Sequence, residues 1–206
     1  MTGWRYKRFI LILILCLFPL LNGCRVIVFD ESKDEQKVEK VVQRPSGNWK
    51  LDAKVQLFKK SLLIRGETTF PKGSIVDVHL KPYPDDATSL QIIRTAVEPL
   101  DTVASSGTVI VKKDGTMESI TIPRPSENKR YRLEIVLDPR KQKEDVKKIL
   151  GSLGENLSNS SGSVTLTDES ENVTTIKKYA NIMKREEPDG FMAKLNLVAF
   201  DYLDEQ

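Results

Sequence analysis

The sequence predicts a mainly β fold, a β-sandwich that carries one helix. Apolar and polar residues alternate in several short runs between Trp49 and Tyr202, as they do in strands that bury one face. Turn-forming residues separate these runs at short intervals, which is typical of a sandwich. Apolar residues recur at helical spacing over several turns in one segment, at about residues 139–153, which predicts a single amphipathic helix.

The first strands are indicated by pairs of apolar residues two positions apart. Val55 with Leu57, and then Leu62 with Ile64, each mark the buried face of a short strand. A turn signal at residues 70–73 combines proline with glycine, and the next run alternates apolar and polar side chains. We therefore expect three strands before residue 82.

The second half of the pattern contains the clearest strand, residues 131–137. Before it, Asp114-Gly115 predicts a hairpin between strands at 108–112 and 120–122, because Asp-Gly favours the tight turns that join antiparallel strands. Residues 90–98 fit either a strand or a short helix. The remaining predicted strands are residues 164–166, 173–183 and 191–202.

The helix between these strands has its own start and stop signals. Asp138 is a candidate N-cap and Pro139 fits the first helical position, whereas Gly151 weakens the C-terminal half. About eight strands and one helix are expected to form an immunoglobulin-like or fibronectin-like sandwich over residues 47–206, with the helix as a crossover or a cap. The alternative is a division into two small domains near Ser126.

The amino terminus has the composition of an export signal. Arg5, Lys7 and Arg8 precede an apolar run, Phe9 to Leu21, of 13 residues. A helix that spans a bilayer needs roughly 18–20 apolar residues, so this run fits a signal peptide better than a membrane span.

The next four residues, Leu21-Asn22-Gly23-Cys24, resemble the lipobox of bacterial lipoproteins, with a branched residue at −3 and a small one at −1. The resemblance implies that residues 1–23 are removed and that Cys24 receives fatty acyl groups such as palmitate. It also implies attachment to the extracytoplasmic face of the cell membrane, because two or more acyl chains anchor a protein firmly. An uncleaved signal anchor, or an ordinary signal peptide followed by a chance cysteine, is the alternative.

The remaining chain carries no net charge. Of 32 basic residues three lie in the first 23 positions, which leaves 29 against 29 acidic residues. A neutral chain without a basic stripe lacks the electrostatic signature of nucleic-acid binding. Residues 24–46 mix charges of both signs and are expected to form a solvated tether.

Candidate catalytic and ligand-binding groups are few. His79 is the single histidine; it falls on the polar face of its predicted strand and is expected to face solvent. The sequence holds no nucleophile–histidine motif, no set of cysteine ligands and no EF-hand spacing, so no catalytic residue, metal or cofactor is predicted. Groups expected to be solvated or to aid packing are Asp85-Asp86, the acidic cluster 168–171, Gly151 with Gly154, and the helix cations Arg140, Lys141, Lys143, Lys147 and Lys148.

These features favour a membrane-anchored binding module over an enzyme. Its expected partner is a protein or another component of the cell envelope, contacted through loops such as 82–89 and 158–172 or through an edge strand. The alternative is a surface hydrolase that uses two carboxylates from separate strands. Carriage of a small ligand is a third possibility, for which the chain is short.

Overall fold

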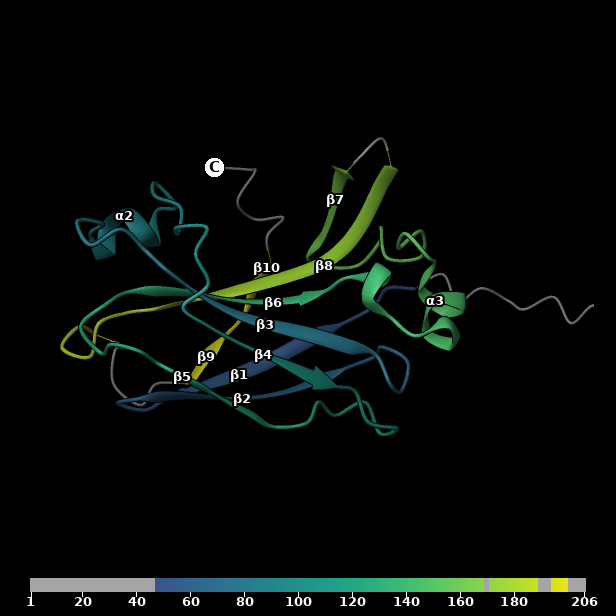
Figure 1. Ribbon diagram of the computed structural model, residues 1–206, viewed down its shortest axis with the longest axis horizontal. Coiled ribbons are helices and arrows are strands. Elements are labelled where there is room, and N and C mark those ends of the chain that lie inside the picture. The colour runs from purple at the N-terminus through teal and green to yellow at the C-terminus, as the bar shows by residue number, and fades with distance from the viewer. Residues whose placement is uncertain (1–46, 169–170, 189–193, 200–206) are drawn as a thin grey trace, which may run out of the picture. The chain divides into compact units, whose positions relative to one another are not determined.

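The computed structural model describes residues 47–168, 171–188 and 194–199 (Figure 1). Within them, antiparallel strands form two sheets with a common apolar core between them. The prediction of a mainly β sandwich is therefore confirmed. The described residues fall into one compact unit, and strands from both sides of Ser126 contribute to the same core. The expected signal peptide, Cys24 and the tether lie outside the described residues.

Sheet 1 has the strand order β5-β2-β1-β9. Its strands are β1 (Leu51–Leu57), β2 (Ser61–Thr68), β5 (Ile120–Pro123) and β9 (Lys194–Asn196). A three-residue connection joins β1 to β2, and the backbone N–H of Phe58 donates to the carbonyl of Ser61 at 2.9 Å. This turn sets Leu57 opposite Leu62, and the register of the whole hairpin follows from it.

Sheet 2 has the order β10-β8-β6-β3-β4, and β7 pairs with β8. Its strands are β3 (Ile75–Pro82), β4 (Ser105–Ile110), β6 (Tyr131–Leu137), β7 (Ser163–Asp168), β8 (Glu171–Ile182) and β10 (Val198–Ala199). The bounds of β6 are those that the sequence predicts. Its alternating residues Tyr131, Leu133, Ile135 and Leu137 are all buried in the core.

The chain crosses between the sheets at both edges. β9 pairs with β1 in sheet 1, and after Leu197 the same run continues as β10 beside β8 in sheet 2. At the other edge, the connection from β4 to β5 makes isolated bridges between Val111 and Met117 and between Glu67 and Thr116. β4 and β5 lie in different sheets, so the hairpin predicted between them is not formed. Their connection still turns at Asp114-Gly115, where Gly115 has a φ of 81°.

The strand order matches the expected topology. β1-β2-β5 takes the positions A-B-E of an immunoglobulin-like domain, and β8-β6-β3-β4 takes G-F-C-C′. Tyr131 begins β6, which is strand F, and its hydroxyl accepts a hydrogen bond from the backbone N–H of Ser126 at 3.1 Å. This contact is the tyrosine corner that such domains place before strand F.

The helices are shorter than the sequence predicts. The segment expected at 139–153 contains a 3₁₀ turn, η2 (Pro139–Lys141), and a separate helix, α3 (Glu144–Leu150). Asp138 caps η2 as predicted, but Gln142 between the two is extended because its side-chain amide binds the backbone of Ile75. Its Oε1 accepts from the Ile75 N–H at 2.7 Å and its Nε2 donates to the Ile75 carbonyl at 2.8 Å.

The two α-helices of the described residues lie in connections between strands (Figure 1). α3 ends at Gly151, whose φ is 90°, and buries Val146 and Leu150 in the core, so it caps one end of the sandwich. A short helix, α2 (Ser89–Ile93), lies in the long connection from β3 to β4 and begins at a capping box made by Thr88 and Gln91. Residues 90–98 therefore contain a helical turn rather than a strand.

Trp49 fastens the start of the domain to the α3 end. Its backbone N–H donates to Ser160 Oγ at 2.9 Å, and its indole Nε1 donates to the Asn156 carbonyl at 3.0 Å. Ser160 Oγ also donates to the carbonyl of Gly47 at 3.1 Å. The chain upstream of Gly47 therefore joins the sandwich at this end.

Candidate functional site

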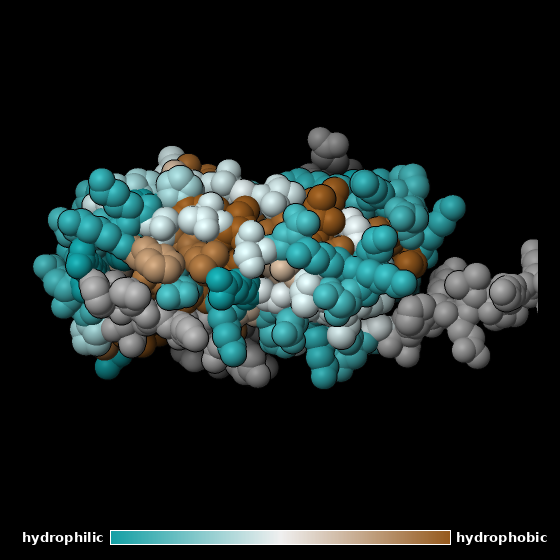
Figure 2. All heavy atoms as spheres, turned by 90° about the horizontal axis from the view of Figure 1, so that it is seen from below, coloured by the Kyte–Doolittle hydropathy of each residue, from teal (hydrophilic) through white to brown (hydrophobic). Residues whose placement is uncertain are grey.

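A groove of about 760 Å³ lies on the outer face of sheet 1. Its floor consists of β1 and β2. Its walls are the connection from β4 to β5, which supplies Lys112, Thr116 and Ser119, and Leu197 between β9 and β10. Figure 2 shows the molecule from the side of this sheet, with an apolar area in the middle of the face and hydrophilic residues around it.

Strand alternation decides which side chains reach the groove. β1 buries Leu51, Ala53, Val55 and Leu57 in the core, so its intervening residues point outward. The same parity holds in β2, where Leu62 and Ile64 are buried. The outward residues that line the groove are Asp52, Lys54 and Gln56 from β1 and Leu63, Arg65 and Glu67 from β2.

The register of the hairpin places like charges opposite each other. Asp52 is the partner of Glu67, and Lys54 is the partner of Arg65. Side chains that face each other in this way have Cβ atoms about 5 Å apart, and like charges at such positions destabilise a sheet. The floor therefore carries an acidic row and a basic row side by side. The next row pairs Gln56 with Leu63 and is uncharged.

Few of these charges are neutralised within the described residues. Lys178, which points inward from β8 and is 8% exposed, reaches Asp52 at 3.6 Å. Among the described residues no ion pair within 4.0 Å involves Lys54, Arg65 or Lys112, so these three cations line the groove with their charge available to a ligand.

The apolar part of the lining depends on a glycine. A Cβ added to Gly66 would lie 2.8 Å from Met117 Sδ and 2.7 Å from the Asp52 carbonyl oxygen, so a side chain at this position would displace its neighbours. Because Gly66 has none, Met117 packs against β2 and is buried. Two other apolar residues of the lining, Ala53 and Leu197, are respectively in the core and packed against it.

His79 lies on the outer face of sheet 2, as predicted, but it is half-buried rather than solvent-facing. Its Nδ1 is enclosed and has no hydrogen-bond partner in the described part of the chain. Burial lowers the pKa of His79, and the nearby Asp77 carboxylate opposes this shift, with smaller effects from Lys141, Glu134 and Lys81. The neutral form of the imidazole is therefore favoured.

The carboxylates beside His79 are both paired. Asp77 accepts from Lys141 Nζ at 2.6 Å, and Glu134 lies 3.1 Å from Lys81 Nζ. Neither acid is free to act as a base or a nucleophile without breaking an ion pair. In the described part of the chain, no group of three or more His, Cys, Asp or Glu side chains is placed to hold a metal ion.

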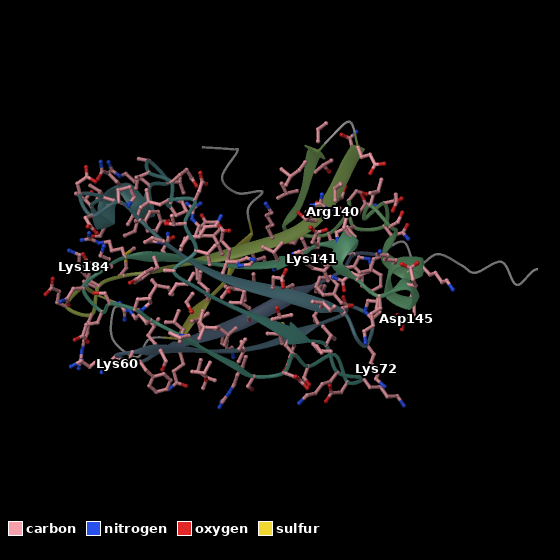
Figure 3. All side chains as sticks on the ribbon, in the orientation of Figure 1. Lys60, Lys72, Arg140, Lys141, Asp145 and Lys184 are labelled. Carbon is pink, nitrogen blue, oxygen red and sulfur yellow. The ribbon has the colours of Figure 1, made fainter. Side chains whose placement is uncertain are left out.

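The predicted basic surface of the helix is also partly neutralised. Arg140 and Lys141 lie at the same end of the sandwich as α3 (Figure 3). Arg140 binds Asp138 at 2.9 Å, Lys141 binds Asp77, and Lys147 lies 3.3 Å from Glu144. Gly151 and Gly154 take positive φ values of 90° and 82°, which glycine adopts readily, and Gly151 follows the end of α3 instead of opening a helix.

The two predicted contact loops differ in structure. Segment 82–89 begins the connection that carries α2, and Arg130 holds this connection by binding both the Ala87 carbonyl and Glu187. Asp85 in it is 76% exposed and pairs with Lys129 at 3.0 Å. Segment 158–172 contains β7, and part of its acidic tip, residues 169–170, lies outside the described residues.

The groove residues were not predicted as a site. The alternation of Asp52, Lys54 and Gln56 with buried neighbours was the available signal, but their cross-strand partners depend on the register of β1 with β2. Scans against family models, curated proteins and solved structures gave no match for this chain. In the described residues, no helix has the length and hydrophobicity that a membrane crossing requires.

Proposed function

We propose that this protein is a lipid-anchored, extracytoplasmic binding module that holds a partner from the cell envelope in the groove of sheet 1. The groove carries the proposal, because it is an open cavity lined by cations that have no ion-pair partner among the described residues. The lipobox-like residues that end at Cys24 supply the anchor, and residues 24–46 supply the tether between membrane and domain.

The geometry favours binding over hydrolysis by carboxylates. Asp52 and Glu67 do come from separate strands and line one groove. A general acid, however, needs an environment that keeps it protonated, usually burial in an apolar pocket. The Asp52 side chain is 80% exposed and lies 3.6 Å from Lys178 Nζ, so no apolar pocket encloses it. These surroundings suit recognition of a charged ligand.

The anchor is tested by replacing the lipobox cysteine. Cells that express Cys24→Ser should retain the unprocessed chain or release it from the membrane, whereas a Ser32→Cys control with Cys24 intact should fractionate with the membrane. Mass spectrometry of the mature N-terminus measures the lipid directly. An unmodified Cys24 on a membrane-bound chain would contradict the lipoprotein part of the proposal.

The binding surface is tested by photo-crosslinking in intact cells. A photoreactive residue in place of Gln56, in the groove, should give a defined adduct that disappears when Lys54→Glu and Arg65→Glu are added. The same residue in place of Ser106, which is exposed on β4 in the other sheet, should give no such adduct. Equal adducts at both positions, or an adduct whose yield is unaffected by the two charge changes, would contradict the assignment of the groove as the binding surface.

A further inference from the structure

The charged rows of the groove are separated by two residues along each strand. Asp52 with Glu67 forms the acidic row, and Lys54 with Arg65 forms the basic row. The rise per residue in an antiparallel strand is about 3.4 Å, so the rows lie about 7 Å apart. A ligand that matches both must present a cation and an anion at this separation.

An extended polypeptide has this spacing as a property of its backbone. Residues i and i+2 of a β-strand point to the same side and are about 7 Å apart. From this match we infer that the groove binds an extended polypeptide segment in which one basic and one acidic side chain stand two residues apart. The inference rests on the proposed function and names the chemistry of the partner.

The acidic row argues against a uniformly anionic ligand. A phosphate polymer of the cell envelope would be attracted by Lys54 and Arg65, but its next charge would meet Asp52 and Glu67. The polypeptide instead places its basic side chain over the acids and its acidic side chain over the bases. Lys112 on the wall adds a further cation near this floor, which favours a carboxylate as the more strongly held of the two groups.

The third row extends the pattern by one more side chain. Gln56 and Leu63 lie opposite each other two residues beyond the basic row. An apolar side chain two residues beyond the ligand's acid would reach Leu63. The full pattern is therefore base, any residue, acid, any residue, apolar residue, read in either chain direction.

The experiment uses the full chain in detergent micelles and three acetylated, amidated heptapeptides titrated by isothermal calorimetry. Their central residues are Lys-Thr-Glu-Thr-Val, Glu-Thr-Glu-Thr-Val and Lys-Thr-Lys-Thr-Val. The first should bind at least about fivefold more tightly than the other two. Each competitor reverses one charge, which replaces an attraction by a repulsion of similar size, together about 1 kcal/mol. Equal binding of all three peptides would overturn the inference.

Two double variants should redirect this preference. Lys54→Glu with Arg65→Glu makes the floor acidic and should favour the peptide with two lysines. Asp52→Lys with Glu67→Lys makes it basic and should favour the peptide with two glutamates. Lys60→Glu, at the end of the sandwich far from α3 (Figure 3), reverses a charge outside the groove lining and should leave the wild-type order unchanged.

A glycerol-phosphate oligomer serves as the competing probe. If the wild-type chain binds it more tightly than the Lys-Thr-Glu-Thr-Val peptide, the groove recognises polyanions and the inference is wrong, although the proposed binding function stands. Absence of the crosslinked adduct at Gln56 in cells would instead contradict the proposed binding function. The two failures are therefore measured by different experiments.

Discussion

The hydroxyl of Tyr131 accepts a hydrogen bond from the backbone N–H of Ser126, 3.1 Å away and five residues earlier in the chain. Tyr131 is the first residue of β6, and its side chain is 1% exposed. The contact ties the connection that arrives from sheet 1 to the first residue of a central strand of sheet 2. It therefore fixes the point at which the chain changes sheets.

Loss of this hydroxyl should destabilise the domain. Tyr131→Phe keeps the ring in the core but leaves the Ser126 N–H without its acceptor, so we expect a loss of about 1–2 kcal/mol in the free energy of unfolding. Urea denaturation followed by tryptophan fluorescence measures it. Thr121→Val removes an exposed hydroxyl from the adjacent sheet and should change stability by less than about 0.5 kcal/mol. Equal effects of the two substitutions would mean that the corner is not a stabilising contact.

Tyr83 should make the protein sensitive to alkaline pH. Its hydroxyl donates to Asn181 Oδ1 at 2.7 Å and accepts from Arg132 Nε at 3.1 Å. Burial raises the pKa of Tyr83 to about 12, and the Arg132 guanidinium opposes this rise. Above pH 10 the unfolded chain loses this proton while the folded chain keeps it, so stability is full below pH 10 and falls as the pH rises toward 12.

The comparison with Tyr83→Phe isolates this effect. At pH 8 the variant should be less stable than wild type by about 1–2 kcal/mol, because Arg132 and Asn181 lose a partner. Between pH 10 and 12 the wild type alone loses the Tyr83 contribution, about 2–3 kcal/mol for a shift of two pKa units. The stability advantage of the wild type should therefore shrink to zero or reverse by pH 12. Parallel pH profiles measured by urea denaturation would contradict the raised pKa.

His79 should give the opposite dependence at acidic pH. Because burial lowers the pKa of His79 below 6.5, the unfolded chain takes up a proton before the folded chain does. Stability from the neutral imidazole is therefore present above pH 6.5 and is lost as the pH falls through the folded pKa. His79→Gln should lose less stability than wild type between pH 7 and 5, measured by thermal unfolding. A larger loss in the variant would show that the folded state prefers the imidazolium.

Two glycines share a backbone conformation but differ in the space that is open to an added Cβ. Gly73 has a φ of 86° and a Cβ there would meet nothing within 4 Å, whereas at Gly154, with a φ of 82°, it would lie 2.0 Å from the Thr174 carbonyl oxygen. Gly73→Ala should cost about 1 kcal/mol from the left-handed conformation alone. Gly154→Ala should cost about 2–4 kcal/mol, because the backbone must also move. Equal midpoints of urea unfolding would contradict this difference.

The alternation of side chains was enough to predict the sandwich and the bounds of β6. It was not enough for the helix, because the break at Gln142 depends on a hydrogen-bonded contact with Ile75, 67 residues earlier in the chain. Local spacing shows that residues 139–153 have an apolar stripe. It does not show that the backbone of Ile75, in the distant strand β3, forms hydrogen bonds with the Gln142 side chain.

The groove could be predicted in part. Alternation in the first hairpin already places Lys54 and Arg65 on outward faces. Their position opposite each other requires the register, which the short connection after Leu57 sets and which the sequence pattern left open. The wall of the groove is harder to predict than its floor, because the connection that ends at β5 supplies it. Met117 of this connection approaches Gly66, which is a contact between segments far apart in the sequence.

Trp49 determines how the domain bears mechanical load. A force applied to the chain upstream of Gly47 acts first on the hydrogen bonds from Trp49 to Asn156 and Ser160. If these break, the force acts next on β1. β1 is hydrogen-bonded to β2 on one side and to β9 on the other, so the bonds beside it share the force as shear instead of opening one by one. A ligand seated over β1 and β2 would therefore be held by the strand pair that receives the tension directly.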